Sequence, residues 1–223
     1  MSDSPTPKGI PNSPQPIKWF DAAMPVVPRE DVQYLQNDAP RLSIVVMVYK
    51  MPEQAKKTLY SLSAAYQRGV TENDYEVIVM ENPSSRILGK EAAEKWGGNF
   101  HYQAYPETLP TPVNAMNFGA AHARGRMIAV MIDGARMVSP GIVNYILAAE
   151  RLHRDVVVAV PGYHLGNKVQ QEAMLEGYDE AYEQTLLDKV QWPQDGYRLF
   201  EICCLSGTSA GGYLKPLGES NVL

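Results

Sequence analysis

Short apolar runs alternate with helical patterns along the chain from Arg41 onward. Continuous, β-branched runs are typical of strands buried on both faces, and they lie at LSIVVMV (42–48), YEVIVM (75–80), MIAVMI (127–132) and VVVAV (156–160). FHYQAY (100–105) predicts a weaker, more exposed strand. Strands that alternate with helices predict parallel βαβ units. We therefore expect an α/β fold with a Rossmann-like, mostly parallel sheet flanked by helices.

Helix-start residues and helical spacing fill the segments between these strands. Pro52 suits the first turn of a helix whose apolar positions run to Tyr66, and Gly69 closes that segment. Further helices are predicted from Ser84–Ser85 toward Trp96, from Thr111–Pro112 to Gly125, from Ser139–Pro140 to Ala149, and near 170–190.

Residues 1–40 differ in composition from the rest of the chain. Eight of the 17 prolines lie there, among Ser, Asn and Gln residues with little periodicity. Proline disfavours helix interiors and central strands. We therefore expect an extended or disordered arm at 1–40 and one folded domain at 41–223.

Charge and cysteine content narrow the function classes. A net charge of −5 and a pI of about 5.4 disfavour a nucleic-acid partner, because such a binding surface is normally basic. The adjacent Cys203 and Cys204 cannot together form a long-range disulfide, and they fit a reducing compartment. No apolar run reaches the roughly 18 residues of a membrane span, and the N-terminus lacks the order of a secretory signal. We expect a cytoplasmic protein, with peripheral membrane association left open.

Polar residues follow the apolar runs where the strands are predicted to end. Tyr49 and Lys50 follow the first run, Glu81 follows the second, and Asp133 follows the run that ends at Ile132. In an open parallel sheet, ligands bind outside the carboxyl ends of the strands. A carboxylate there can bind ribose hydroxyls, a base edge or a divalent cation, but an acid before a turn can equally cap that turn. The residues alone leave both interpretations open.

From about Leu42 to Pro140 the chain resembles family 2 glycosyltransferases, which have the A-type nucleotide-sugar-binding fold. The resemblance is carried by LSIVVMVYKMPEQAKKTLYSL (42–62), YEVIVMENPSS (75–85) and NAMNFGAAHARGRMIAVMIDGAR (114–136), in the family's order and spacing. It implies an inverting transferase that moves a sugar from a nucleoside-diphosphate sugar to a hydroxyl group, as in polysaccharide biosynthesis. The resemblance leaves the acceptor open, as a glycan, a lipid-linked molecule or a small molecule.

The resemblance also implies roles for individual residues. Val48 and Tyr49 would line the base pocket, and Glu81 would hold the base or the ribose. Asn117 would support the nucleotide site, and Asp133 would lie beside ribose and diphosphate.

Several positions depart from the family pattern. Ala135 replaces the acid that most directly holds Mg²⁺ or Mn²⁺ in the family, and Met116 replaces a frequent arginine. Asp133 is then the remaining candidate metal ligand, and we expect at most weak metal binding that depends on the donor phosphates. Arg136 either neutralises the leaving diphosphate in place of the metal or points to solvent.

The inverting reaction needs a general base that takes the proton of the acceptor hydroxyl. In the family this base lies in an acidic motif well downstream, and Glu219 is the candidate here. The ending at Leu223 resembles the interior of the acceptor half, so we expect that half to be incomplete.

Two other interpretations stay open. If the chain lacks both the metal-binding carboxylate and the general base, it would be a non-catalytic or degenerate nucleotide-sugar-binding protein. GTSAG (207–211) also matches the nucleophile elbow of α/β-hydrolases, with Ser209 as the nucleophile. No histidine follows Ser209, so the chain order does not fit that triad. His164 either touches a ligand at the same sheet edge or has only a structural role.

Overall fold

The computed structural model describes residues 39–107, 109, 111–132, 134–153 and 156–206, and the backbone of 221–222. The predicted arm at 1–40 lies outside the described residues except for Ala39 and Pro40. None of the described helices combines the length and the apolar composition needed to cross a membrane.

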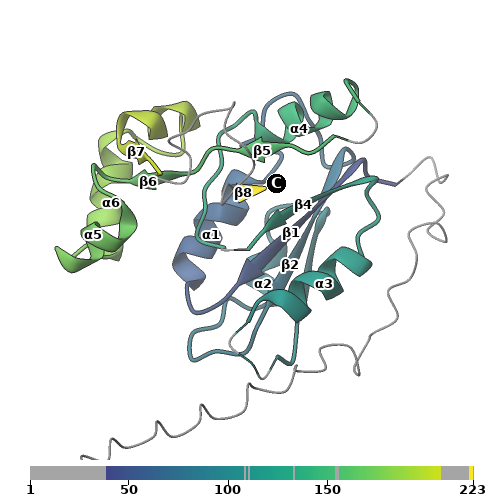
Figure 1. Cartoon of the computed structure of the whole chain (residues 1–223), viewed down its shortest axis with the longest axis horizontal. Coiled ribbons are helices and arrows are strands. Elements are labelled where there is room, and N and C mark those ends of the chain that lie inside the picture. Colours follow the sequence, from purple (N-terminus) through teal and green to yellow (C-terminus); the bar gives the residue numbers. More distant parts are fainter. Residues whose placement is uncertain are drawn as a thin grey trace, which may run out of the picture. The chain divides into compact units, whose positions relative to one another are not determined.

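A four-stranded parallel sheet forms the centre of the fold. Its strands are β1 (Leu42–Val48), β2 (Tyr75–Glu81), β3 (Phe100–Ala104) and β4 (Met127–Met131), in the spatial order β3-β2-β1-β4 (Figure 1). Every residue of β1 and β2 is buried, whereas β3 is largely exposed. The predicted α/β fold with a parallel sheet is confirmed.

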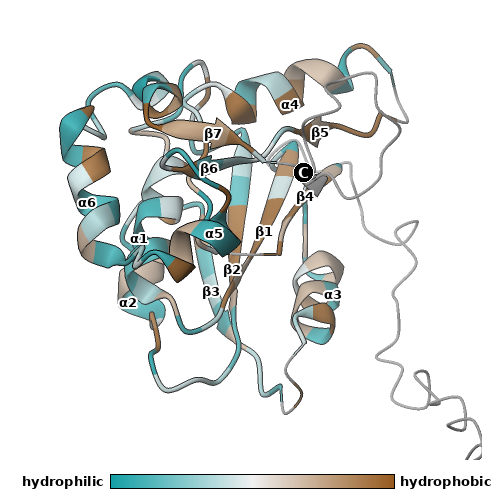
Figure 2. Ribbon diagram, turned by 60° about the vertical axis from the view of Figure 1, so that its left-hand side comes forward, coloured by the Kyte–Doolittle hydropathy of each residue, from teal (hydrophilic) through white to brown (hydrophobic). Residues whose placement is uncertain are grey.

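Helices cover both faces of the sheet. Figure 2 shows α3 (Val113–Ala121) on one side, and α1 (Pro52–Ser61) and α2 (Lys90–Glu94) on the other. Helix α4 (Ile142–Glu150) packs in the same cluster as α1 and α2. Alternate residues of β1 therefore serve two cores, with Ile44 facing α1 and Val45 facing α3.

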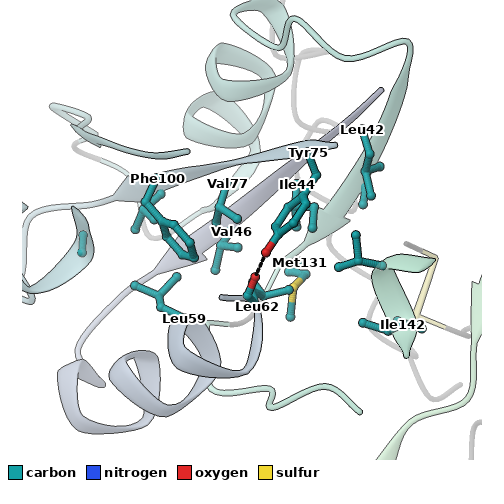
Figure 3. Close-up of a cluster of buried hydrophobic side chains, with 14 of the residues drawn as sticks. Leu42, Ile44, Val46, Leu59, Leu62, Tyr75, Val77, Phe100, Met131 and Ile142 are labelled. Carbon is teal, nitrogen blue, oxygen red and sulfur yellow. Dashed lines mark hydrogen bonds between the residues drawn. The ribbon is translucent and has the colours of Figure 1, made fainter. Parts of the chain in front are cut away.

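The larger core includes a buried tyrosine whose hydroxyl has a protein partner. Tyr75 is fully buried, and its hydroxyl donates a 2.6 Å hydrogen bond to the carbonyl oxygen of Leu62 (Figure 3). Burial raises the pKa of Tyr75 well above its ordinary value, so the hydroxyl stays protonated. This bond ties β2 to the segment that follows α1.

A buried carboxylate connects the amino ends of the central strands to the segment before β4. Glu76 is 2% exposed and accepts hydrogen bonds from the Ser43 hydroxyl at 2.6 Å and from the Arg124 backbone N–H at 2.8 Å. The Arg124 guanidinium also pairs with it. The chain passes so close here that a Cβ on Gly125 would lie 2.5 Å from the Ser43 nitrogen. Glycine is therefore required at that position.

Short elements follow the sheet. Strand β5 (Ala159–Val160) pairs antiparallel with β8 (Asn221–Val222), and β6 (Tyr163–Leu165) pairs antiparallel with β7 (Cys203–Leu205). Helices α5 (Gln170–Leu175), α6 (Glu180–Lys189) and the 3-10 helix η2 (Gly196–Glu201) lie between β6 and β7 in sequence. A separate buried cluster of Leu187, Val190 and Ile202 packs α6 against the segment of η2.

The run at 156–160 was predicted as a buried strand of the main sheet, and this prediction is wrong. Only Ala159 and Val160 form a strand, their partner is β8, and Val157 is 64% exposed. β-Branched composition favours extended backbone, but a strand also needs a hydrogen-bonding neighbour, and that neighbour is distant in sequence.

Two helix predictions also need correction. The helix expected to start at Ser84–Ser85 starts at Lys90, because the Glu81 carboxylate binds the backbone N–H groups of Leu88 and Gly89 and holds this segment as a loop. The helix expected near 170–190 is two helices. Gly177 adopts a left-handed φ of 90° between them, and the Asp179 side chain caps the second helix.

Candidate functional site

The strand order reverses at β1, between β2 and β4. In open parallel sheets, ligands bind outside the carboxyl ends of the strands at such a reversal. β1 connects through α1 to β2 on one side, and β4 lies on its other side (Figure 1). The turn after β4 crosses the end of β1 at close range. A Cβ on Gly134 would lie 2.6 Å from the Met47 carbonyl oxygen and 3.1 Å from Val48 Cγ2. Because glycine has no Cβ, the turn after β4 can pack directly on the carboxyl end of β1.

Tyr49 presents an aromatic ring at this edge. It directly follows β1 and is 41% exposed, and the Lys50 ammonium lies 4.9 Å from its ring centroid. Lys50 adopts a left-handed φ of 63°, an uncommon conformation for a residue other than glycine. Val48, in contrast, is 1% exposed, so its side chain belongs to the core. An exposed ring beside a sheet edge offers a stacking surface to a planar ligand.

Glu81, at the end of β2, is bound by protein groups. Its carboxylate is 2% exposed and accepts hydrogen bonds from Leu88 N at 2.6 Å, Gly89 N at 3.0 Å and the Tyr102 hydroxyl at 2.8 Å. Burial, together with this carboxylate, raises the pKa of Tyr102 to about 12. Glu81 therefore anchors the loop that follows β2. Its direct contact with a base or ribose stays a prediction.

Asn82 is the residue at this edge that sequence reasoning missed. Its backbone N–H donates to the Val48 carbonyl at 3.2 Å, and its side-chain Nδ2 donates to the Thr111 carbonyl at 3.1 Å. The residue is 6% exposed, yet its Oδ1 has no hydrogen-bond partner within the described part of the chain. A buried acceptor without a partner is costly, so a ligand donor at this position would be favourable. The sequence signal was its place directly after the strand-end acid.

The other predicted site residues are partly described. Asn117 and Arg136 are exposed. Asp133, Ser209 and Glu219 lie outside the described residues, so their predicted roles stay predictions. Gly119, two residues after Asn117, has a packing role, because a Cβ at this position would lie 2.6 Å from Val45 Cγ1.

Basic groups lie beside the turn that follows β4. Met137 and Leu165 pack against the same cluster of Leu187, Val190 and Ile202, which brings this turn next to β6. Partial burial and, secondarily, the charge of Arg136 lower the pKa of His164. Arg136 and His164 therefore lie within electrostatic range of each other.

The residues at this edge fit a divalent metal poorly. Ala135 supplies no carboxylate, and among the described residues no group of three His, Cys, Asp or Glu side chains could hold a metal ion. Mg²⁺ and Mn²⁺ prefer several oxygen ligands. Asp133 alone would supply one carboxylate to such an ion.

Comparison with known proteins identifies the family of this chain. The model of the family "Glycosyl transferase family 2" matches residues 43–203. A crystal structure of S. aureus TarS 1-349 is similar at a TM-score of 0.45 and 18% identity, over 59% of this chain and 38% of that chain. The chain thus spans well under half of that solved chain. No curated protein matches. Because the family model covers most of the sequence, the chain belongs to glycosyl transferase family 2.

Proposed function

We propose that this chain transfers a sugar from a nucleoside diphosphate to an acceptor hydroxyl, with inversion at the anomeric carbon. Family membership supports the transferase class. The observation that carries the donor site is the buried Oδ1 of Asn82, which has no hydrogen-bond partner within the described part of the chain. Asn82 is bonded through its backbone N–H to Val48, the residue before the exposed Tyr49, where the strand order reverses. Residues 41–223 would form the transferase domain, acting in the cytoplasm.

The donor base would lie between Tyr49 and Asn82. The Tyr49 ring would stack on the base, and Asn82 Oδ1 would accept a hydrogen bond from a ring N–H. Uracil and guanine carry such an N–H next to a carbonyl group, whereas cytosine and adenine have an acceptor nitrogen at the corresponding edge. We therefore propose UDP or GDP as the nucleotide. Glu81 would hold the loop that carries Asn82. Val48 would help to position Asn82, because its backbone carbonyl accepts a hydrogen bond from the Asn82 N–H.

The remaining residues would position the reacting groups. Asp133 would lie beside the ribose and diphosphate, with Asn117 supporting the nucleotide site and Arg136 facing the diphosphate. The acceptor oxygen attacks the anomeric carbon from the face opposite the phosphate, forming one C–O bond as the bond to the diphosphate breaks. Glu219 would take the acceptor proton. The acceptor would be a glycan, a lipid-linked molecule or a small molecule.

A non-catalytic nucleotide-sugar binder is the second candidate, and Ala135 is the observation that favours it. The two candidates differ in turnover. The purified chain is incubated with UDP- and GDP-sugars, with and without a mixture of glycan and lipid-linked acceptors, and nucleotide release is measured. Release that requires an acceptor supports the transferase. Binding without release supports the second candidate.

Binding itself is tested by calorimetry with UDP and GDP. Tyr49→Ala is expected to weaken binding by about 1–3 kcal/mol, because aromatic stacking on a base is worth that much in nucleic-acid sites. Tyr145→Ala is the matched control, since Tyr145 is a 63% exposed tyrosine on α4. Wild-type protein that binds neither nucleotide would refute both candidates.

A further inference from the structure

The turn after β4 and strand β6 pack against one buried cluster, through Met137 and Leu165. Arg136 and His164 are the sequence neighbours of these two residues and lie within electrostatic range of each other. Arg136 is exposed, and His164 is only partly buried. The charge of Arg136 contributes to the lowered pKa of His164, which agrees with this proximity.

This pair lies next to the edge where the donor would bind. Gly134 packs on the end of β1, and Arg136 is two residues further along the same turn. Tyr49 and Asn82 lie at the same edge, one after β1 and one after β2. A nucleotide whose base occupied those two residues would extend its diphosphate toward the β4 turn, because the strand order there runs β2-β1-β4.

The chemistry of the turn favours an anion over a metal ion. Ala135 offers no oxygen ligand, and the next side chain carries a permanent positive charge. A guanidinium presents a planar set of N–H donors that matches phosphate oxygens, and an imidazole adds a further N–H donor. A divalent cation beside Arg136 would instead meet like charge.

We propose that Arg136 and His164 together bind the donor diphosphate and replace the metal ion in neutralising the leaving group. This inference rests on the proposed nucleotide-sugar transfer. As the bond between the anomeric carbon and the phosphate oxygen breaks, the electron pair goes to the diphosphate, and the added negative charge lies against the Arg136 guanidinium. His164 donates its ring N–H to a diphosphate oxygen.

The test compares a nucleoside with its diphosphate. Calorimetry is run with UDP, GDP, uridine and guanosine, once with EDTA and once with Mn²⁺. Arg136→Gln is expected to weaken UDP or GDP binding about 10- to 100-fold, the loss typical of a charge-assisted hydrogen bond. Nucleoside binding should stay unchanged, because a nucleoside has no diphosphate. Wild-type affinity for the diphosphate should be the same in EDTA and in Mn²⁺.

The variants separate a direct contact from a structural effect. His164→Gln should weaken diphosphate binding less than Arg136→Gln, because the imidazole contributes one neutral donor. Arg151→Gln is the control, since Arg151 is an exposed arginine directly after α4. Equal loss of nucleoside and diphosphate binding in Arg136→Gln, or unchanged diphosphate binding, would overturn the proposal. Diphosphate binding that disappears in EDTA would also overturn it. Failure of the wild type to bind any of the four probes would instead refute the proposed function.

Discussion

The buried polar groups at the two ends of the parallel sheet differ in their hydrogen bonding. At the amino end, the buried Glu76 carboxylate is held by Ser43 and Arg124, so its charge is compensated within the chain. At the carboxyl end, the amide oxygen of Asn82 is buried without a partner among the described residues, and Tyr49, at the end of the neighbouring strand, is exposed. Both ends belong to the same strands. Hydrogen-bonded buried groups stabilise the fold, whereas a buried polar group without a partner calls for an explanation, and the proposed donor site supplies one.

Glu81 shows that the carboxyl end of the sheet also contains a residue that stabilises the fold. It lies at the carboxyl end, yet its carboxylate accepts hydrogen bonds from three protein donors, Leu88 N, Gly89 N and the Tyr102 hydroxyl. A strand-end acid can therefore position a site without touching the ligand. This distinction between anchoring and contact is what the following substitutions measure.

The largest expected effect is the loss of stability in Glu76→Ala. The substitution removes the acceptor of the Ser43 hydroxyl and of the Arg124 backbone N–H, and it leaves a cavity. The free energy of unfolding should fall by about 3 kcal/mol, somewhat less than for a fully buried pair because the Arg124 side chain is 58% exposed and can be solvated. Urea denaturation checks this value.

The control for that measurement is Glu91→Ala, which removes an exposed carboxylate in the first turn of α2. Its effect should be within about 0.5 kcal/mol. A similar loss in both variants would show that the Glu76 network contributes nothing beyond an ordinary surface charge. Folded Glu76→Ala protein should bind UDP or GDP as the wild type does.

The next effect concerns Glu81 and separates anchoring from ligand contact. Glu81→Ala should weaken UDP or GDP binding by about 1–3 kcal/mol, through lost hydrogen bonds to the ligand or to the loop. Tyr102→Phe removes one of the protein donors to Glu81 and leaves the carboxylate in place. If Glu81 only anchors the loop, both variants should lose stability and affinity in proportion. Affinity lost in Glu81→Ala alone would assign Glu81 a direct ligand contact.

Sequence patterns predicted the strands of the main sheet but not its polar edge. β1, β2 and β4 were predictable because each apolar run alternates with a helical segment. The similar run at 156–160 forms only a two-residue strand outside that sheet, so an apolar run alone was not sufficient. The partner of β5 was not predictable, because β8 follows more than 60 residues later and pairs through backbone groups. The loop at 82–89 was missed because its hydrogen bonds come from a side chain, that of Glu81.

The residues of the candidate site could also be predicted only in part from the sequence. Tyr49 and Glu81 were identified because strand-end positions can be read directly from the sequence. Whether the Asn82 oxygen has a partner depends on where Val48 and Thr111 lie in space, and no local pattern encodes that. The juxtaposition of Arg136 and His164 depends likewise on packing between Met137 and the cluster around Leu187.

A smaller effect is expected from Asn82→Ala. Loss of the acceptor should reduce UDP or GDP affinity by about 1–2 kcal/mol, because one buried hydrogen bond to the base is removed. Stability should change by less than about 0.5 kcal/mol, since the lost bond to Thr111 is offset by removal of a buried oxygen that has no partner among the described residues. Calorimetry and urea denaturation measure the two quantities. Unchanged affinity would remove Asn82 from the base site, and a large loss of stability would place it with the anchoring residues.

The smallest effect is the pH dependence that His164 gives to stability. Partial burial and the charge of Arg136 lower its pKa in the folded protein below the ordinary value of 6.5. As the pH falls through about 6.5, His164 becomes protonated in the unfolded chain while it is still neutral in the folded protein. The free energy of unfolding therefore decreases. The contribution is fully present above pH 6.5 and is lost as the pH falls toward the folded pKa. Urea denaturation at about pH 7.5 and pH 5.5 should show a smaller difference in His164→Gln than in the wild type, because glutamine does not titrate. His153→Gln is the control, since His153 is exposed. If the free energy of unfolding changes equally with pH in the wild type and in His164→Gln, His164 is solvated like a surface histidine. Arg136 alone would then distinguish the turn beside the carboxyl end from the amino end of the sheet.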